Sequence, residues 1–308
     1  MGSDSNPLVT FAIICYNQER FIEECVRSAL AQTYSPLEIV ISDDGSRDNS
    51  FQVIEKIISN YTGPHKVIIS RNKKNMGLAD NINRVWDLSS GEFLIMQGGD
   101  DVSVPHRTAT LVKAWLSVIP SPLIVYSDLT IIDEESNKIS PFEHNGAIDY
   151  SNAIKDSLTG TKSPFVIGGC VAAYARSVHT KVGSLGSDVF AEDFVYSFRA
   201  LLAGGGFVRV AEPLVMYRKN HESMMGRLGN AKISGEQLMK AELALITEYK
   251  KAIAVYGNVN TYLRWRLNFR SKVVEQKLKL KMMRAGFLQR IRVLLTKGSL
   301  WKIRKPFQ

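Results

Sequence analysis

Cysteine and long apolar runs are both scarce in this chain of 308 residues. Its three cysteines, Cys15, Cys25 and Cys170, are too few and too widely spaced for a disulfide framework or a zinc site. No stretch approaches the roughly 18 uninterrupted apolar residues that a membrane-spanning helix needs. The first seven residues are polar, so we expect no secretory signal. These features favour a globular protein of a reducing compartment, and we expect a cytoplasmic location.

Acidic residues are nearly missing from the C-terminal end. Residues 264–308 contain 14 Lys or Arg and one acid, Glu275, a net charge of +13, whereas the preceding 263 residues carry 25 basic and 29 acidic residues. Tryptophan, phenylalanine and leucine are interspersed among the basic residues. This pattern favours an amphipathic helix on an anionic membrane surface, or alternatively a helical appendage packed on the globular body. Nucleic acid is a weaker alternative because no nucleic-acid-binding motif accompanies the charge.

Short apolar runs alternate with amphipathic segments through the first 126 residues. The apolar runs predict strands, and the segments between them repeat apolar residues at helical spacing. Such alternation is typical of an α/β fold with a mainly parallel sheet flanked by helices. The expected strands are 9–15, 37–42, 66–70, 93–97 and 123–126.

The pattern loosens after residue 126. Residues 137–165 are polar and without a clear period, which predicts a loop. Residues 194–202 predict a helix, and 207–210 and 214–217 predict two short strands. From about residue 230 the chain is expected to be helical to its end, with interruptions near Gly257, Gly286 and Gly298.

Three pairs of adjacent acids follow apolar segments or begin helices. Asp43-Asp44 comes directly after an expected strand, and Asp100-Asp101 follows another one after two glycines. Glu192-Asp193 begins an expected helix. Open α/β sheets bind ligands at the carboxyl ends of their strands. One or two carboxylates together with substrate phosphates are a common site for Mg²⁺. The three pairs therefore predict a metal-dependent site that handles a nucleotide.

The motifs around these acids resemble those of the family-2 glycosyltransferases, which have the GT-A fold. The resemblance runs from about residue 8 to residue 223, and the motifs stand in the order of the family. They are Val9–Asn17, Ser42–Asp48, Asn75–Gly77, Gly98–Asp101, Glu192–Asp193 and Tyr217–His221. The resemblance implies an inverting, metal-dependent glycosyltransferase of polysaccharide or glycan biosynthesis. It would move a sugar from a nucleotide sugar, most often a UDP-sugar, to a hydroxyl of a glycan or lipid-linked acceptor.

The resemblance and the local chemistry together assign the donor side of the site. Tyr16 is expected to cover the uracil ring, because an aromatic face stacks on a base. Asp44 is expected to accept a hydrogen bond from the ring N–H of the pyrimidine, and Asn75 and Gly77 belong to a turn that returns to the site. The resemblance also places the donor next to Gly99 and Asp101.

Asp100 aligns with the last acid of the family's Asp-X-Asp motif, which implies that it binds Mn²⁺ or Mg²⁺, with His221 as a second metal or diphosphate contact. Gly98 departs from the family, because many relatives have the first acid of the motif there. Asp193 is the expected general base that takes the proton of the acceptor hydroxyl. Glu192 is expected to bind the acceptor or to hold Asp193 in place. Arg218 could pair with a phosphate or with an acid, and the sequence does not decide between them.

Two other function classes compete with this interpretation. A sugar nucleotidyltransferase would be expected to have a basic, glycine-rich loop after the first strand, where this chain has Cys15–Glu19. A non-catalytic module that binds nucleotide sugars or membranes would not need both Asp100 and Asp193. The expected organisation is a flexible N-terminus (1–7), a catalytic domain (8–228) and a basic helical region (229–308). Within the catalytic domain we expect a nucleotide-binding half (about 8–126) and an acceptor half (about 127–228).

Overall fold

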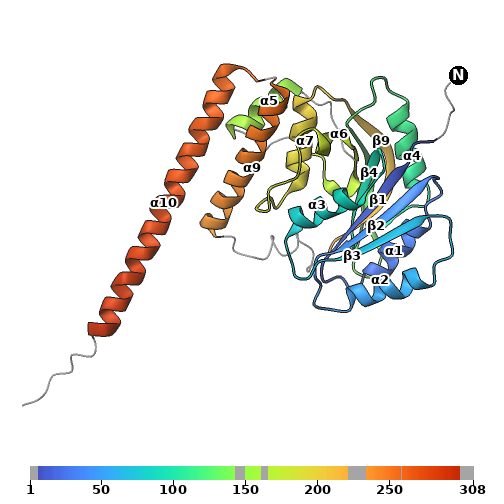
Figure 1. Cartoon of the computed structure of the whole chain (residues 1–308), viewed down its shortest axis with the longest axis horizontal. Helices are drawn as coiled ribbons and strands as arrows, with labels where there is room; N and C mark the ends of the chain where they lie inside the picture. Colours follow the sequence, from blue (N-terminus) through green and yellow to red (C-terminus); the bar gives the residue numbers. More distant parts are fainter. Residues whose placement is uncertain (1–5, 143–149, 161–165, 221–233, 258, 299–308) are drawn as a thin grey trace, which may run out of the picture.

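The computed structural model describes residues 6–142, 150–160, 166–220, 234–257 and 259–298. Of residues 142, 150–151 and 284–298 it describes the backbone alone. The described chain forms one nine-stranded mixed sheet with helices on both faces, and two long helices lie beside this layer (Figure 1). The strand order is β3-β2-β1-β4-β8-β6-β9-β5, with β7 paired to β6. The α/β fold predicted from the sequence is confirmed.

The first four strands are parallel and lie where the apolar runs predict them. They are apolar on both faces because helices cover both sides of the sheet, and every residue of β2 is buried. The strands are β1 (Val9–Cys15), β2 (Leu37–Asp43), β3 (Lys66–Arg71) and β4 (Phe93–Gly98).

The remaining strands extend the sheet beyond β4 and include antiparallel pairs. β8 is antiparallel to both β4 and β6, β6 is parallel to β9, and β5 and β7 pair antiparallel with β9 and β6. Their bounds are β5 (Val102–Ser103), β6 (Ile124–Ile132), β7 (Lys138–Phe142), β8 (Ala172–Ala175) and β9 (Phe207–Arg218).

Successive side chains of β1 point to opposite faces of the sheet, and each face has its own core. Phe11 and Ile13 pack with α1, α2 and α4, while Ala12 packs in the second core, to which α3, α6 and α7 contribute. A third apolar cluster joins α5, α7, α9 and α10. The helices are α1 (Ile22–Leu30), α2 (Ser50–Ser59), α3 (Leu78–Leu88), α4 (Arg107–Leu116), α5 (Tyr150–Thr159), α6 (Ser177–Thr180), α7 (Glu192–Leu202), α9 (Gly235–Tyr256) and α10 (Thr261–Gly298), with a 3-10 turn at Gly169–Val171.

Three sequence expectations were wrong. Residues 137–165 contain β7 and α5 rather than a loop alone, because β7 is held by backbone pairing with β6 and α5 buries few apolar side chains. The two short strands at 207–217 are one strand, since a register shift opposite Asp128 accommodates Pro213. Gly286 does not interrupt α10, which continues to Gly298. No helix within the described ranges is long and apolar enough to span a bilayer.

Candidate active site

The carboxyl ends of β1, β2 and β4 meet at one edge of the sheet, since the three strands are parallel and in register. Two backbone hydrogen bonds continue this alignment past the strand ends. The N–H of Asp44 donates to the Cys15 carbonyl (2.8 Å), and the N–H of Gly99 donates to the Ile14 carbonyl (2.9 Å). Tyr16, Asp44 and Gly99 therefore lie side by side at the edge where open α/β sheets bind their ligands.

The carboxylate of Asp44 is buried and organises the loop that precedes α3. It accepts hydrogen bonds from the backbone N–H groups of Met76 and Gly77 (both 2.9 Å) and from the side chain of Asn72 (2.8 Å). The Asn75 side chain also accepts from the N–H of Gly77 (2.9 Å). The structure thus brings together Asp44, Asn75 and Gly77. A carboxylate offers about four acceptor positions, of which these donors occupy three.

Tyr16 is half-buried and lies at the start of a turn that is tied to the turn after β2. The next residue, Asn17, has a positive φ of 54°, its N–H donates to the Ser46 hydroxyl, and its side chain accepts from the N–H of Arg47. Gly45, between these turns and the loop before α3, also has a positive φ (69°), and a Cβ there would lie 2.6 Å from the backbone carbon of Lys74. The close approach of the three loops therefore depends on a glycine at position 45.

Substituting Gly45 by alanine is expected to destabilise the fold more than the same change at Gly204. Both glycines have similar positive φ values (69° and 65°), but nothing lies within 4 Å of a Cβ at Gly204. A left-handed alanine costs about 1–2 kcal/mol in either place. The overlap with Lys74 is expected to add about 1–3 kcal/mol for Gly45→Ala alone. Denaturant unfolding of both variants measures the difference, and equal losses would show that the Lys74 backbone moves away without cost.

Asp100 and Asp101 follow β4 and are both buried. The Asp100 carboxylate accepts from the side chain of Asn220 (2.8 Å), and the Asp101 carboxylate accepts from the N–H of Arg218 (2.9 Å). Burial raises the pKa of Asp100, and hydrogen bonds from Asn220 and Gln18 oppose that rise. Burial, and then the neighbouring Asp100 charge, raise the pKa of Asp101 well above its ordinary value. Two adjacent carboxylates that are disfavoured as anions form a place where a cation would be stabilising.

The residues at this edge fit a divalent metal of the kind that relies on substrate phosphates. Among the described residues, no group of three or more His, Cys, Asp or Glu side chains could hold a metal ion by itself. Asp100 would be the protein ligand, since one or two carboxylates plus phosphate oxygens are common ligands of Mg²⁺. His221, expected as a second contact, lies outside the described residues.

The glycines before Asp100 have a steric role in this structure. A Cβ on Gly98 would lie 2.9 Å from an Asp100 carboxylate oxygen and 3.3 Å from an Asp101 oxygen. A Cβ on Gly99 would overlap the side chain of Gln18. The carboxylates of Asp100 and Asp101 therefore occupy the space that a side chain at position 98 would need. This explains sterically why a glycine stands here in place of the family's first acid. Gly99 serves close packing against the turn after β1, next to the expected donor position.

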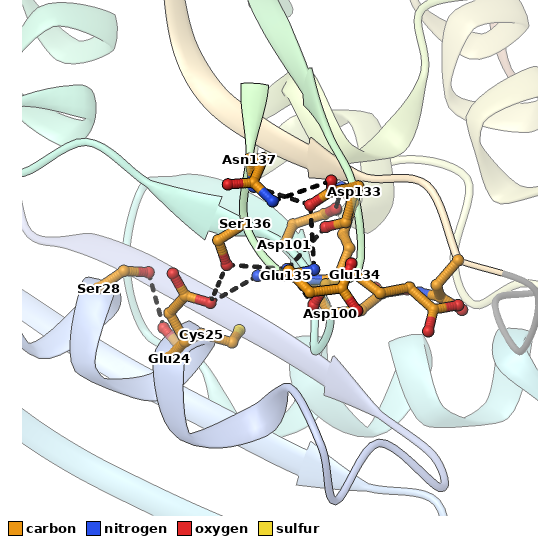
Figure 2. Close-up of polar contacts among 12 residues, drawn as sticks. Glu24, Cys25, Ser28, Asp100, Asp101, Asp133, Glu134, Glu135, Ser136 and Asn137 are labelled. Carbon is orange, nitrogen blue, oxygen red and sulfur yellow. Dashed lines mark hydrogen bonds and ion pairs between the residues drawn. The ribbon is translucent and has the colours of Figure 1, made fainter. Parts of the chain in front are cut away.

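Arg218, at the end of β9, is buried and connects β9 to α1, to the residues after β4 and to the turn between β6 and β7. Figure 2 shows the residues of these segments, among them Glu24, Asp100 and Ser136. The Arg218 guanidinium donates to the Asp100 carbonyl (2.9 Å) and to the Glu24 carboxylate (2.6 Å) of α1. It also donates to the turn between β6 and β7, at the carbonyls of Asp133 and Glu134 and the hydroxyl of Ser136. The sequence allowed Arg218 to pair with a phosphate or with an acid. In this structure it pairs with the acid Glu24 and with backbone carbonyls.

Glu192 and Asp193 begin α7 and are both largely buried. Burial raises the pKa of Asp193 to about 6. Backbone hydrogen bonds, among them those from Phe194 (2.9 Å) and Gly169, oppose this rise. Burial, followed by the Asp193 charge, raises the pKa of Glu192 to about 8. A Cβ on Gly169 would overlap the Glu192 carboxylate, so a glycine there lets the acid lie against the backbone. Asp193 is therefore the more readily ionised carboxyl of the pair.

Acids of both pairs lie within electrostatic reach of Cys170. Burial and the charges of Asp101, Asp100 and Asp193 all raise the pKa of the Cys170 thiol, whereas Arg107 lowers it. The Cys170 carbonyl accepts from the Arg107 guanidinium (2.8 Å), which is itself buried beneath β4 and also bonds to the Met96 carbonyl. Sequence reasoning missed Asn220, Gln18, Gly169 and the contacts of Arg218. The only local signal was the place of Arg218 and Asn220 in the Tyr217–His221 motif.

Known proteins share both the sequence pattern and the fold. "Putative glycosyltransferase EpsE" of Bacillus subtilis is 30% identical over 131 residues, which is 42% of this chain and 46% of that protein. A chondroitin synthase of Pasteurella multocida is 36% identical over 110 residues, 36% of this chain and 11% of that protein. The matched part of this chain thus spans less than half the length of these curated relatives.

Two solved structures share the fold at low sequence identity. S. aureus TarS 1-349 in complex with UDP-GlcNAc has a TM-score of 0.57 and 16% identity, covering 84% of this chain and 70% of that one. The mannosyltransferase PcManGT from Pyrobaculum calidifontis, in complex with GDP-Man and Mn²⁺, has a TM-score of 0.51 and 16% identity, covering 98% and 89%.

The family model "Glycosyl transferase family 2" matches residues 10–183, which include Tyr16, Asp44 and Asp100 and end before Glu192. The resemblance read from the sequence motifs is confirmed. Since the matched residues are more than half of the chain, this protein belongs to glycosyl transferase family 2.

Proposed function

We propose that this chain is an inverting, metal-dependent glycosyltransferase that moves a hexose from a nucleotide sugar to a hydroxyl of a glycan or lipid-linked acceptor. The observation that carries the proposal is the placement of Asp44, Asp100 and Asp101 after parallel strands at the carboxyl edge of the sheet, together with a second acidic pair, Glu192 and Asp193, at the start of α7. Asp100 and Asp101 from the first pair and Asp193 from the second each raise the pKa of the Cys170 thiol, so acids of the two pairs lie within electrostatic reach of one cysteine. One pair would hold the leaving group, and the other would activate the acceptor.

The donor nucleotide is proposed to be UDP. Asp44 keeps one acceptor position, which suits the ring N–H of uracil, and adenine lacks such a ring donor. Tyr16 begins the neighbouring turn and would stack on the base. Relatives of the same fold were solved with UDP-GlcNAc and with GDP-Man, and guanine also has a ring N–H. The donor therefore needs a direct test against GDP.

Asp100 is the residue proposed to hold Mn²⁺ or Mg²⁺. When bound, the metal would neutralise the charge of the diphosphate and so ease its departure from the sugar. Asn220 and Gln18 orient the Asp100 carboxylate through their hydrogen bonds. Asp101, held by the N–H of Arg218, would support the same site.

Asp193 is the proposed general base. The acceptor oxygen forms a bond to the anomeric carbon while the bond from that carbon to the diphosphate oxygen breaks, and Asp193 takes the hydroxyl proton. The pKa of about 6 keeps Asp193 ionised at neutral pH, close to the value that favours proton transfer there. Glu192, with a pKa of about 8, remains protonated and could donate a hydrogen bond to the acceptor. Neighbouring carboxyls whose pKa values differ in this way commonly divide such roles.

The acceptor is proposed to be met at an anionic membrane surface on the cytoplasmic face. The support is the net charge of +13 in residues 264–308, mixed with aromatic and aliphatic residues. A glycan under synthesis on a lipid carrier is held at such a surface, so peripheral binding would raise the local concentration of the acceptor.

A thermal-shift screen with Mn²⁺ and the diphosphates of uridine, thymidine, guanosine and adenosine tests the proposal. UDP is expected to give the largest shift, since a ligand at 100 times its Kd stabilises a fold by about 2.7 kcal/mol. A coupled assay then measures release of UDP from UDP-sugars with and without glycan acceptors. Binding without release would favour a non-catalytic module, and release of pyrophosphate would favour a nucleotidyltransferase. No shift with any diphosphate would overturn the proposed function.

A further inference from the structure

One face of α10 is fixed by its packing on the rest of the protein. Leu267, Ser271 and Val274 are buried in the contact with α9 and α5, and Arg270 forms an ion pair with Glu242 of α9 (2.8 Å). Because successive residues of a helix are rotated by about 100°, these positions define the inward face and also the opposite, outward face. α10 is the outermost element on this side of the molecule (Figure 1).

Three exposed aromatic rings lie in a row along the outward face. Tyr262, Trp265 and Phe269 are 59%, 56% and 55% exposed, and their rings stack at centroid distances of 6.3 and 5.6 Å. Leu280 and Met283 continue the same face and are 58% and 68% exposed. The exposed Gln276 lies between these two groups on the same face. Exposed apolar side chains gathered on one face of a folded protein commonly mark a binding surface.

Basic residues border this apolar strip on both sides. Helical spacing places Lys272 and Lys279 along one border and Arg266 and Lys277 along the other. Within residues 264–283 the chain has seven basic residues and one acid, Glu275, which accepts a hydrogen bond from Ser271 near the inward side. The exposed apolar side chains of the outward face are thus bordered on both sides by basic side chains.

We propose that this face, defined by Tyr262, Trp265, Phe269, Leu280 and Met283 with its Lys and Arg borders, docks on the surface of an anionic lipid bilayer. Tyr and Trp rings settle at the boundary between headgroups and acyl chains, and Lys and Arg side chains reach the phosphates beside them. A second copy of the same face is a poorer partner, because it would bring like charges together. Nucleic acid would use the charges and the rings but would leave Leu280 and Met283 without a partner. The proposal specifies the partner surface of the proposed enzyme, whose acceptor would be met there.

Cosedimentation of the full chain with vesicles tests this docking face. The probes are vesicles of phosphatidylcholine alone and vesicles that also contain about 30 mol% phosphatidylglycerol. This fraction gives the second set a negative surface like that of an anionic leaflet. The aromatic variant is Trp265→Ala/Phe269→Ala, and its control is Leu238→Ala, which removes an exposed apolar side chain from α9. The charge variant is Lys272→Glu/Lys279→Glu, and its control is Lys113→Glu on α4.

The wild-type protein is expected to bind the anionic vesicles at low salt, to ignore the neutral ones and to be released in part as salt is raised. Both double variants should lower the partition coefficient by roughly tenfold or more, because each basic residue near the surface adds about a fivefold factor and the rings add apolar burial. The two controls should bind as the wild type does. Unchanged binding of the aromatic variant, or binding to neutral vesicles alone, would overturn the docking face.

Two further measurements separate the competing explanations. Sedimentation velocity without lipid reports self-association, and a dimer that the aromatic variant breaks would overturn the lipid proposal in favour of a second copy. Preferential binding to a DNA duplex over vesicles would overturn it in favour of nucleic acid. The UDP-induced thermal shift should be the same in every variant, so loss of vesicle binding with an intact shift isolates this face. A wild-type protein without any nucleotide shift would count against the proposed function and not against the docking face.

Discussion

Asp193→Asn is expected to lower the rate of sugar transfer by roughly 10²–10⁴-fold, the usual contribution of a general base. The amide has nearly the shape of the carboxylate, and its oxygen can still accept the hydrogen bond from the N–H of Phe194. It cannot take up the proton of the acceptor hydroxyl. Donor affinity should therefore stay at the wild-type value while kcat falls, as measured by UDP release with saturating acceptor.

The pH profile of the wild-type enzyme gives an independent readout of the same group. Burial raises the pKa of Asp193 to about 6, so the base is protonated and inactive below that pH. We expect kcat/KM, which reports the ionisation of the free enzyme, to fall as pH decreases through about 6, and the Asp193→Asn variant to lose this limb. Asp188→Asn, at an exposed carboxylate in the loop before α7, should behave as the wild type. Transfer at a near wild-type rate by Asp193→Asn would show that another residue is the base.

The strands that precede Asp44 and Asp100 could be predicted because their signals are local. β1, β2 and β4 are short apolar runs that end in polar residues, and the hydrogen bonds of a parallel sheet then fix where those ends meet. Asp44 and Asp100 follow from this placement without knowledge of any long-range side-chain contact. The same reasoning failed for β7, which has little apolar pattern and is held by its pairing with β6.

The contacts that organise the site could not be predicted, because they join residues far apart in the sequence. Arg218 reaches Glu24, 194 positions away, and Asn220 reaches Asp100, 120 positions away. Each partner is set by the pairing of β9 with β5 and β6, which brings the end of β9 to α1 and to the residues after β4. An arginine at the end of a strand has no local feature that identifies its acceptor. The pKa values of Glu192 and Asp193 likewise depend on burial beside Gly169, which the residues 192–193 do not encode alone.

Asp44 shows how a residue with a predicted role in binding can have a structural role as well. The family resemblance assigns it to the base of the nucleotide. In the structure its carboxylate also fixes the loop before α3 through two backbone N–H groups and Asn72. Any variant of Asp44 would therefore disturb the loop and the nucleotide contact together, so it is a poor residue for testing the donor alone. Asp100 is better suited, because its partner Asn220 is a side chain rather than a loop backbone.

Asp100→Ala is expected to abolish the stabilisation that Mn²⁺ adds to UDP binding without unfolding the protein. In the wild type, metal and nucleotide should stabilise one another, and at 100 times the Kd the gain is about 2.7 kcal/mol in the free energy of unfolding. The variant should keep only the smaller shift given by UDP without metal. Calorimetric titration of UDP with and without Mn²⁺ measures the affinity directly, and Asp188→Ala is the control at an exposed acid.

The ligand-free stability of the same variant distinguishes loss of a metal ligand from loss of the fold. Burial raises the pKa of Asp100, so the folded state favours the protonated acid. As pH rises above the ordinary pKa of an aspartate, ionisation of Asp100 therefore lowers the free energy of unfolding. Removing the carboxylate takes away that cost together with the hydrogen bond from Asn220, so Asp100→Ala should be about as stable as the wild type at pH 7. Since Asp101 remains, buried and bonded to the N–H of Arg218, the end of β4 should keep its shape. A variant of normal stability whose UDP affinity still increases with Mn²⁺ as in the wild type would show that Asp100 does not hold the metal.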